Sequence, residues 1–294
     1  MKKIFLTGAS GKLGTILYPI LNKKYKIFAI SNKKKLPHTT KLNLANNLFL
    51  SKNLDKFSPD IIIHLASLTN VDFCEKNPEI SYKTNVIAVS NLVNWCLKSK
   101  KKIKFIYIST DQIYNRKINK ENDILNPLNF YSFSKLSAEN LVLKLANSTV
   151  IRTNFFGHFP SQKDSLINWF LNELKKGKKV NLVTDINFNP LYVETLCFLI
   201  EKIVSRKNIK GIYNLGSKDR ITKGGLLKNL AKKLNKNLNL FNFVKSNKIN
   251  FFAKRPNNMV MSVNKIEKTL KIKMPTIDSE LNLLKNELIN NHAI

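Results

Sequence analysis

The sequence is poor in cysteine and has no long apolar stretch, and each shortage removes a class of protein from consideration. Its three cysteines, Cys74, Cys96 and Cys197, are widely spaced and set among apolar residues. Their odd number, wide spacing and apolar surroundings predict reduced core thiols, without a disulfide framework or a zinc site. No uncharged stretch is long enough to span a bilayer, and the apolar run at 4–6 is too short for a secretion signal. We therefore expect a cytoplasmic protein without a membrane span.

Acidic residues are also scarce, which leaves a large positive charge. The 294 residues contain 50 Lys and Arg against 19 Asp and Glu, a formal net charge of +31. Such a balance can indicate a nucleic-acid partner. The lysines, however, are spread through the chain and form no basic arm or tail, which favours a solvated basic surface. A nucleic-acid partner is therefore not expected, although the surface would attract phosphate-bearing small molecules.

Glycines are few, 9 in all, yet three of them stand together near the N-terminus. Gly8, Gly11 and Gly14 follow an apolar segment at 3–7 and open an amphipathic helix pattern. In such a G-x-x-G-x-x-G turn the first glycine permits a tight turn, the second lets the backbone approach a pyrophosphate, and the third lets helix and strand pack closely. The helix N-terminus offers N–H groups and partial positive charge to the phosphates. The pattern predicts a dinucleotide-binding site.

The end of the second predicted strand, residues 25–30, bears on which dinucleotide is bound. Ser31, Asn32 and Lys33 follow this strand. An NAD site usually places a carboxylate there for the ribose 2′-hydroxyl, whereas small polar and basic residues accommodate a 2′-phosphate. We therefore expect NADP(H) as the preferred cofactor, with NAD(H) as the alternative. The other interpretation is that the lysines only form a solvated loop.

Strands and helices alternate as far as residue 153. Apolar strands are predicted at 60–66, 103–108 and 149–153, and helices at 78–98 and 131–146. This alternation predicts an α/β fold with a doubly wound parallel sheet of the Rossmann type. His64 lies within the first of these strands; a catalytic role is the alternative, but the alternation favours a hydrogen-bonded histidine in the core or at the end of the sheet.

The pattern loosens after residue 153, without an internal repeat or a low-complexity linker. Helices are predicted at 166–175, 193–204, 226–234 and 277–288, and a strand at 212–215. We expect residues 1–153, joined by 192–215, to form a dinucleotide-binding domain. Residues 154–191 and 216–294 should form a smaller C-terminal α/β lobe that binds substrate over the sheet edge.

The residues with the clearest chemistry lie between 105 and 135. An apolar run ends on Ser109, Thr110 and Asp111, at the predicted carboxyl end of a strand, where open parallel sheets bind ligands. Tyr131 and Lys135 follow one helical turn apart, so an ammonium can lie beside a phenol. A neighbouring positive charge lowers the pKa of a tyrosine, as a proton-transfer group requires. By itself, this spacing also occurs on many solvated helices.

Together, several segments resemble the extended short-chain dehydrogenase/reductase family. They are GASGKLG, STD at 109–111, YSFSK at 131–135, RTNFFG, NPLYVETL and KRPNNMVMSVNKIEKTL, in this order along nearly the whole chain. The fuller set is most similar to the dTDP-4-dehydrorhamnose reductase branch. The resemblance implies that Thr110 is the active-site hydroxyl, that Tyr131 is the proton donor, and that Lys135 binds the nicotinamide ribose and lowers the tyrosine pKa.

The expected ligand contacts follow from the glycine turn and from this resemblance. For the cofactor they are Gly8, Ser10, Gly11, Lys12, Leu13, Gly14, Ser31, Asn32, Lys33, Leu65, Ala66, Asn85, Tyr131 and Lys135. For a nucleotide-sugar substrate they are Asp111, Asn154 and Arg255, with Arg152 either a further contact or a structural ion-pair partner. No metal site is expected.

The resemblance implies hydride transfer from NADPH to a 4-keto nucleotide sugar, with a proton from Tyr131. Gln112 stands where nucleotide-sugar 4,6-dehydratases carry a glutamate that removes a proton, so loss of water is disfavoured. Asn43 and Asn264 depart from acidic residues frequent in the branch. Two alternatives stay open, namely an epimerase on the same scaffold and a non-catalytic dinucleotide-binding regulatory subunit. Homodimers are frequent on this scaffold.

Overall fold

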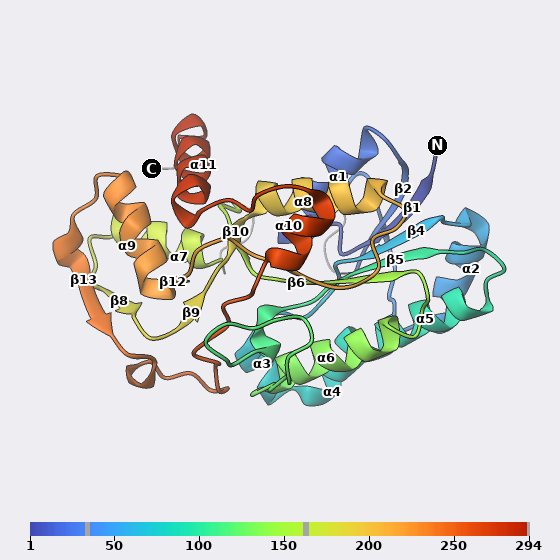
Figure 1. The fold of residues 1–294 in the computed structure, drawn as a ribbon, viewed down its shortest axis with the longest axis horizontal. Helices are drawn as coiled ribbons and strands as arrows, with labels where there is room; N and C mark the ends of the chain where they lie inside the picture. Colours follow the sequence, from blue (N-terminus) through green and yellow to red (C-terminus); the bar gives the residue numbers. More distant parts are fainter. Residues whose placement is uncertain (33–35, 161–164, 293–294) are drawn as a thin grey trace.

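A parallel sheet forms the centre of the molecule in the computed structural model, which describes residues 1–32, 36–160 and 165–292. Its seven strands lie in the order β11-β6-β5-β4-β1-β2-β3, and every neighbouring pair is parallel (Figure 1). The strands are β1 Lys3–Thr7, β2 Lys26–Ser31, β3 Thr39–Lys41, β4 Ile61–His64, β5 Lys104–Ile108, β6 Ser148–Thr153 and β11 Gly211–Leu215. The predicted α/β fold with a doubly wound parallel sheet is confirmed.

Helices cover both faces of this sheet (Figure 1). On one face lie α1 Lys12–Asn22, α8 Val193–Ser205 and α10 Asn264–Leu270, and on the other α2 Asn47–Phe57, α5 Ala88–Lys98 and α6 Phe130–Val142. Successive side chains of a strand point to opposite faces. Accordingly, Ile61 and Ile63 of β4 pack in the core that includes α1 and α8, whereas Ile62 packs in the core that includes α5 and α6. Burial on both faces explains the continuous apolar runs of the strands.

The order in which successive strands are added to the sheet reverses at β1. The strands β2 and β3 lie on one side of it, and β4, β5, β6 and β11 lie on the other. Ligands of open α/β sheets bind outside the carboxyl ends of the strands at such a point. Thr7, His64 and Ile108 end the strands β1, β4 and β5. Residues 109–111 therefore leave the sheet close to the glycine turn that follows β1.

A smaller lobe lies beside the sheet (Figure 1). It contains the helices α7 Leu166–Lys175, α9 Lys223–Lys233 and α11 Ile277–Asn290. Short strands pair as β7 Phe155–Phe156 with β10 Leu191–Tyr192, β9 Asn187–Phe188 with β12 Ile221–Thr222, and β8 Val180–Val183 with β13 Phe241–Val244. Apolar side chains of α7, α9 and α11 belong to the same core cluster as those of α1 and α8. The lobe is therefore packed directly on the sheet layer; its division from the rest at the predicted residue numbers stays a prediction.

The structure differs from the predicted elements in three ways. The helix predicted at 78–98 consists of α4 Pro78–Tyr82, a π-helical turn Lys83–Ile87 and α5. The helix predicted at 131–146 ends at Val142. The sequence pattern did not predict β3, α3 Val71–Lys76, α10 or the short strands of the small lobe, all of which are short. It also did not predict α2, whose apolar residues form no buried stripe: Leu50 and Leu54 are buried, but Leu48 and Phe49 are exposed. The 3₁₀ turns are Asp111–Ile113, Leu238–Leu240 and Ser246–Lys248.

Among the described residues, no helix is both long and apolar enough to cross a bilayer.

Candidate active site

The turn between β1 and α1 requires glycine at two positions. Gly8 has a φ of +69°, and a Cβ there would lie 2.6 Å from the amide nitrogen of Ala66. A Cβ on Gly14 would lie 2.3 Å from the carbonyl oxygen of Gly8. Helix α1 therefore packs closely on the strand, and its N-cap residue Gly11 provides no side-chain cap. Its first N–H groups are suited to the phosphates of a dinucleotide.

The end of β2 lies beside this turn, since the Ala9 N–H donates a hydrogen bond of 3.1 Å to the carbonyl oxygen of Ile30. Ser31 is buried there and Asn32 is exposed, while Lys33 lies outside the described residues. Neither Ser31 nor Asn32 carries a carboxylate. The described part of this edge thus has the polar, uncharged character expected of a site for a 2′-phosphate.

The residues after β5 form a 3₁₀ turn that Thr110 caps. The Thr110 hydroxyl accepts a hydrogen bond of 3.2 Å from the Gln112 N–H. Asp111 is buried, and its Oδ2 accepts a hydrogen bond of 2.8 Å from Asn154 Nδ2. Burial raises the pKa of Asp111 to about 6, against the effects of Asn154, Lys223 and Thr110, which lower it. Two predicted substrate contacts, Asp111 and Asn154, are therefore direct neighbours.

Tyr131 and Lys135 come from the beginning of α6. Asn129 starts this helix with a capping box, because its side chain accepts a hydrogen bond of 2.8 Å from the Ser132 N–H and its own N–H donates to the Ser132 hydroxyl at 3.3 Å. The capping box satisfies backbone groups of the first turn. With the helix start held in this way, Tyr131 and Lys135 both line the cavity that Thr110 lines.

The charges of this pair differ from the sequence prediction. Lys135 Nζ donates a hydrogen bond of 2.7 Å to the Ile108 carbonyl and lies 4.3 Å from the ring centroid of Tyr107. Burial lowers the pKa of Lys135 to about 7. Burial also raises the pKa of Tyr131, while the Thr110 hydroxyl opposes this rise. The pKa of Tyr131 is therefore raised in this structure and not lowered as expected, because desolvation disfavours the phenolate more strongly than its neighbours favour it.

Asn85 and His64 are buried polar residues near Thr110, Tyr131 and Lys135. Asn85, in the π-helical turn, accepts a hydrogen bond of 2.8 Å from the Leu68 N–H and donates one of 3.0 Å to the Ser134 hydroxyl. It thereby connects the segment after β4 to α6; π-helical turns are frequent at functional sites. His64 Nδ1 lies 2.9 Å from the Thr7 hydroxyl, and burial lowers the pKa of His64 to about 3. His64 is buried at the end of β4, as expected of a core or sheet-end histidine, but among the described residues its Nε2 has no hydrogen-bond partner.

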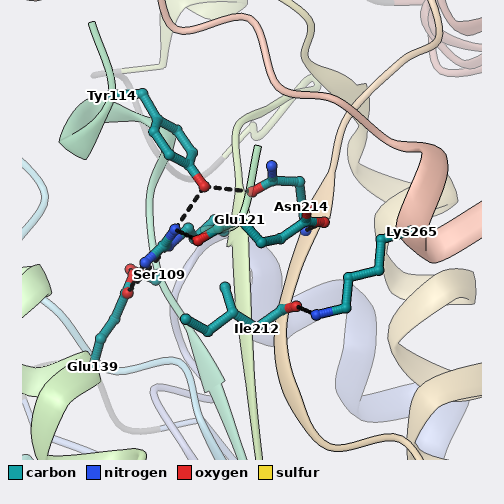
Figure 2. Close-up of polar contacts among 8 residues, drawn as sticks. Ser109, Tyr114, Glu121, Glu139, Ile212, Asn214 and Lys265 are labelled. Atoms are coloured by element: carbon teal, nitrogen blue, oxygen red, sulfur yellow. Dashed lines mark hydrogen bonds and ion pairs between the residues drawn. The ribbon is translucent and has the colours of Figure 1, made fainter. Parts of the chain in front are cut away.

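Arg152, which the sequence left between two roles, is the structural ion-pair partner. Its side chain is 2% exposed and lies 2.7 Å from a carboxylate oxygen of Glu139, which is 0% exposed. It also donates a hydrogen bond of 2.6 Å to the Tyr114 hydroxyl, which in turn donates to Asn214 at 3.0 Å. Figure 2 shows Glu139, Tyr114 and Asn214 of this network, with a dashed line from the Tyr114 hydroxyl to Asn214. Arg152 holds β6 to α6 and to the segment after β5.

A cavity of about 480 Å³ brings the predicted residues together. Those that line it are Gly8, Gly11, Lys12, Leu13, Gly14, Leu65, Thr110, Tyr131, Lys135 and Asn154. Ser10, Ser31, Asn32, Ala66, Asn85, Asp111 and Arg255 are not among its lining residues. Arg255 forms an ion pair of 3.0 Å with Asp72. The glycine turn and the Thr–Tyr–Lys set therefore share one cavity, to which the small lobe contributes the opposite wall.

Sequence reasoning missed most of that opposite wall. It includes Lys223 at the start of α9, Phe188 in β9, and Ser165 before α7. These side chains belong to short elements without a motif, and their placement depends on how the lobe packs. Phe155 and Phe156 also line the cavity, and their place in the RTNFFG segment was the signal that could have identified them. Among the described residues, no cluster of His, Cys, Asp and Glu could hold a metal ion, and the three cysteines are free and buried.

The doubly wound sheet, the glycine turn and the Thr–Tyr–Lys set define the class of the extended short-chain dehydrogenases/reductases, which are oxidoreductases that use nicotinamide cofactors. Within this class, the family model described as the RmlD substrate binding domain matches residues 1–289. The chain therefore belongs to this family.

The relatives agree with that assignment. A dTDP-4-dehydrorhamnose reductase of Aggregatibacter actinomycetemcomitans is 27% identical over 289 residues, which cover 92% of this chain and 94% of the relative. A dTDP-D-glucose 4,6-dehydratase of Dictyostelium discoideum is 30% identical over 257 residues, but these cover 74% of this chain and 58% of the relative's length. The crystal structure of dTDP-4-dehydrorhamnose reductase from Bacillus anthracis in complex with NADP has a TM-score of 0.87 at 25% identity, covering 98% of this chain and 100% of that one. The resemblance read from the sequence is confirmed.

Proposed function

We propose that this protein is an NADPH-dependent reductase of a 4-keto nucleotide sugar, similar to dTDP-4-dehydrorhamnose reductase. The observation that carries the proposal is the meeting of Thr110, Tyr131 and Lys135 with the glycine turn on one cavity. NADP(H) is supported by the uncharged end of β2 and by the NADP complex of the similar reductase, with NAD(H) as the alternative. A cytoplasmic location and a homodimer stay predictions.

Each residue of the set has a chemical task in this reaction. A bound NADPH would supply the hydride, and the glycine turn would hold its phosphates. The Thr110 hydroxyl would donate a hydrogen bond to the carbonyl oxygen, on which negative charge develops. Tyr131 would give its proton to that oxygen, and the raised pKa of its phenol keeps this proton in place beforehand. The Lys135 ammonium would bind the nicotinamide ribose and stabilise the phenolate that remains.

Gln112 favours reduction over dehydration. It lines the cavity beside Thr110, and its Oε1 is buried without a hydrogen-bond partner in the described part of the chain. Dehydration needs a base that removes a proton from a substrate carbon, and a neutral amide cannot act as that base. The similarity to a dehydratase therefore does not extend to the group that would perform its extra step.

The test is NADPH oxidation measured against a panel of 4-keto nucleotide sugars. The Tyr131→Phe variant should lose about 100-fold or more in kcat, the usual contribution of a positioned acid, while NADP⁺ affinity stays unchanged. Tyr82→Phe is the matched control, because it removes a phenol from an exposed position on α4. Net consumption of NADPH separates a reductase from an epimerase, which returns the hydride. An enzyme inactive on the whole panel would contradict the proposal and favour a regulatory subunit.

A further inference from the structure

Lys223 is a cation of the cavity that the proposed hydride and proton transfers do not use. It is the first residue of α9, in the small lobe, and its side chain lines the cavity together with Thr110, Gln112 and Asn154. A lysine on the surface would extend into solvent, because its charge is costly to desolvate. The position of this one facing the substrate side of the catalytic residues therefore needs an explanation.

The backbone holds Lys223 firmly at this place. Thr222 caps α9 through its side chain, and the Lys223 N–H donates a hydrogen bond of 3.0 Å to the Ile186 carbonyl. The next residue, Gly224, lets the helix approach β8, since a Cβ there would lie 2.7 Å from the Val183 carbonyl oxygen. The direction of the Lys223 side chain is thus a consequence of helix packing, and the helix N-terminus adds partial positive charge beside the ammonium.

The Lys223 ammonium has charged neighbours but, within the described part of the chain, forms an ion pair with none of them. Asp111 attracts its ammonium and Arg255 repels it, while burial lowers the pKa of Lys223. The Asp111 carboxylate is already hydrogen-bonded to Asn154 at 2.8 Å, and Arg255 is paired with Asp72. Within the described residues the Lys223 ammonium itself makes no hydrogen bond or ion pair within bonding distance. Its three donors are available to a ligand.

We propose that Lys223 is a specificity-determining residue that binds an anionic oxygen of the substrate, either in the diphosphate or in a carboxylate on the sugar. The inference rests on the proposed function, because it assumes a nucleotide sugar in this cavity. An ammonium binds anionic oxygens through short, charge-assisted hydrogen bonds, and the attraction is strengthened where the cavity excludes water. Asp111 keeps the ammonium in the cavity until the substrate arrives.

The experiment measures binding, so that it is independent of turnover. Wild type, K223Q and K223R, each saturated with NADP⁺, are titrated calorimetrically with dTDP, UDP-glucose and UDP-glucuronate. K232Q is the matched control, since it removes the same charge from an exposed position on the same helix. K223Q should weaken binding by about tenfold or more, the effect of losing one hydrogen bond to a charged group. K223R and K232Q should keep the wild-type affinity, and NADP⁺ binding should not change.

The pattern of losses identifies the anion. A loss for all three ligands assigns Lys223 to the diphosphate, and a loss for UDP-glucuronate alone assigns it to a sugar carboxylate. Equal affinities of K223Q and wild type overturn the inference, even if K223Q unfolds at a lower temperature, since that result shows a structural role. The reductase proposal would survive, because it depends on Tyr131 and NADPH oxidation. A wild type that binds none of the three removes the premise of a nucleotide substrate and the inference with it.

Discussion

The ion pair between Arg152 and Glu139 makes a quantitative prediction about what holds the sheet edge beneath the active site. Arg152→Met keeps a long unbranched side chain but removes the guanidinium. Glu139, 0% exposed, would then be a buried carboxylate without its cation. Glu139 also accepts a hydrogen bond from Ser109, the residue before Thr110, so the perturbation lies directly behind the proposed catalytic hydroxyl.

The expected loss follows from the geometry of the pair. Arg152 donates to Glu139 Oε2 twice, from Nε at 3.1 Å and from Nη2 at 2.7 Å. Removing one partner of such a buried pair costs about 3–5 kcal/mol, because the remaining charge stays desolvated. At about 2 °C per kcal/mol for a chain of this size, R152M should lower the Tm by roughly 6–10 °C. The double variant R152M/E139L removes both charges of the pair, so it should recover most of this loss.

Thermal unfolding of the wild type, R152M and R152M/E139L, followed by circular dichroism at neutral pH, measures these differences. The recovery in the double variant is the critical observation, because it separates an unpaired charge from a simple packing defect. An R152M protein that unfolds within about 2 °C of the wild type, equivalent to one kcal/mol, would refute the reasoning. A double variant as unstable as R152M would show that packing around the guanidinium, not its charge, sets the cost.

Two further predictions concern the cofactor. Gly14→Ala places a Cβ 2.3 Å from the Gly8 carbonyl oxygen, so the turn must shift. We expect a loss of about 1–3 kcal/mol in stability from overpacking and weaker NADP⁺ binding in a fluorescence titration. Gly177→Ala, where a Cβ meets no atom within 4 Å, should leave NADP⁺ affinity unchanged. The pKa of Lys135 is lowered to about 7 by burial, so its ammonium is lost as the pH rises through that value; NADP⁺ affinity should fall with it, and K135R, which stays protonated, should remove the pH dependence. A flat wild-type profile would show that the Lys135 charge does not contribute to cofactor binding.

The sheet and the glycine turn could be predicted from the sequence because their causes are local or periodic. The isoleucines 61–63 form a continuous apolar run, since both faces of β4 are buried. Gly8 and Gly14 are required by contacts within one strand–turn–helix unit. The alternation of strands with crossover helices then predicts a parallel sheet, and Thr110 and the turn both follow the carboxyl ends of its strands.

Features that depend on contacts between distant segments could not be predicted. Arg255 pairs with Asp72, which is 183 residues away in the sequence, and no spacing rule connects them. The one-turn spacing of Tyr131 and Lys135 placed both on one cavity, but it did not reveal how deeply each is buried. That burial decides the direction of both pKa shifts. Lys223 lacked any signal, because its position results from the packing of α9 on β8.

The origins of the cavity residues explain how one family pattern can serve different reactions. Thr110, Tyr131 and Lys135 follow a central strand or belong to α6, and the core on both sheet faces fixes these elements. The proposed proton transfer would need that rigidity, since small displacements of reacting groups cost large factors in rate. Gln112, by contrast, lies on the 3₁₀ turn after β5, and Lys223 lies at the start of α9 in the small lobe. Both positions are outside the strands, so substitutions there should leave the sheet intact. A reductase and a dehydratase are both similar to this chain, as expected if the choice of reaction and substrate rests on such peripheral positions.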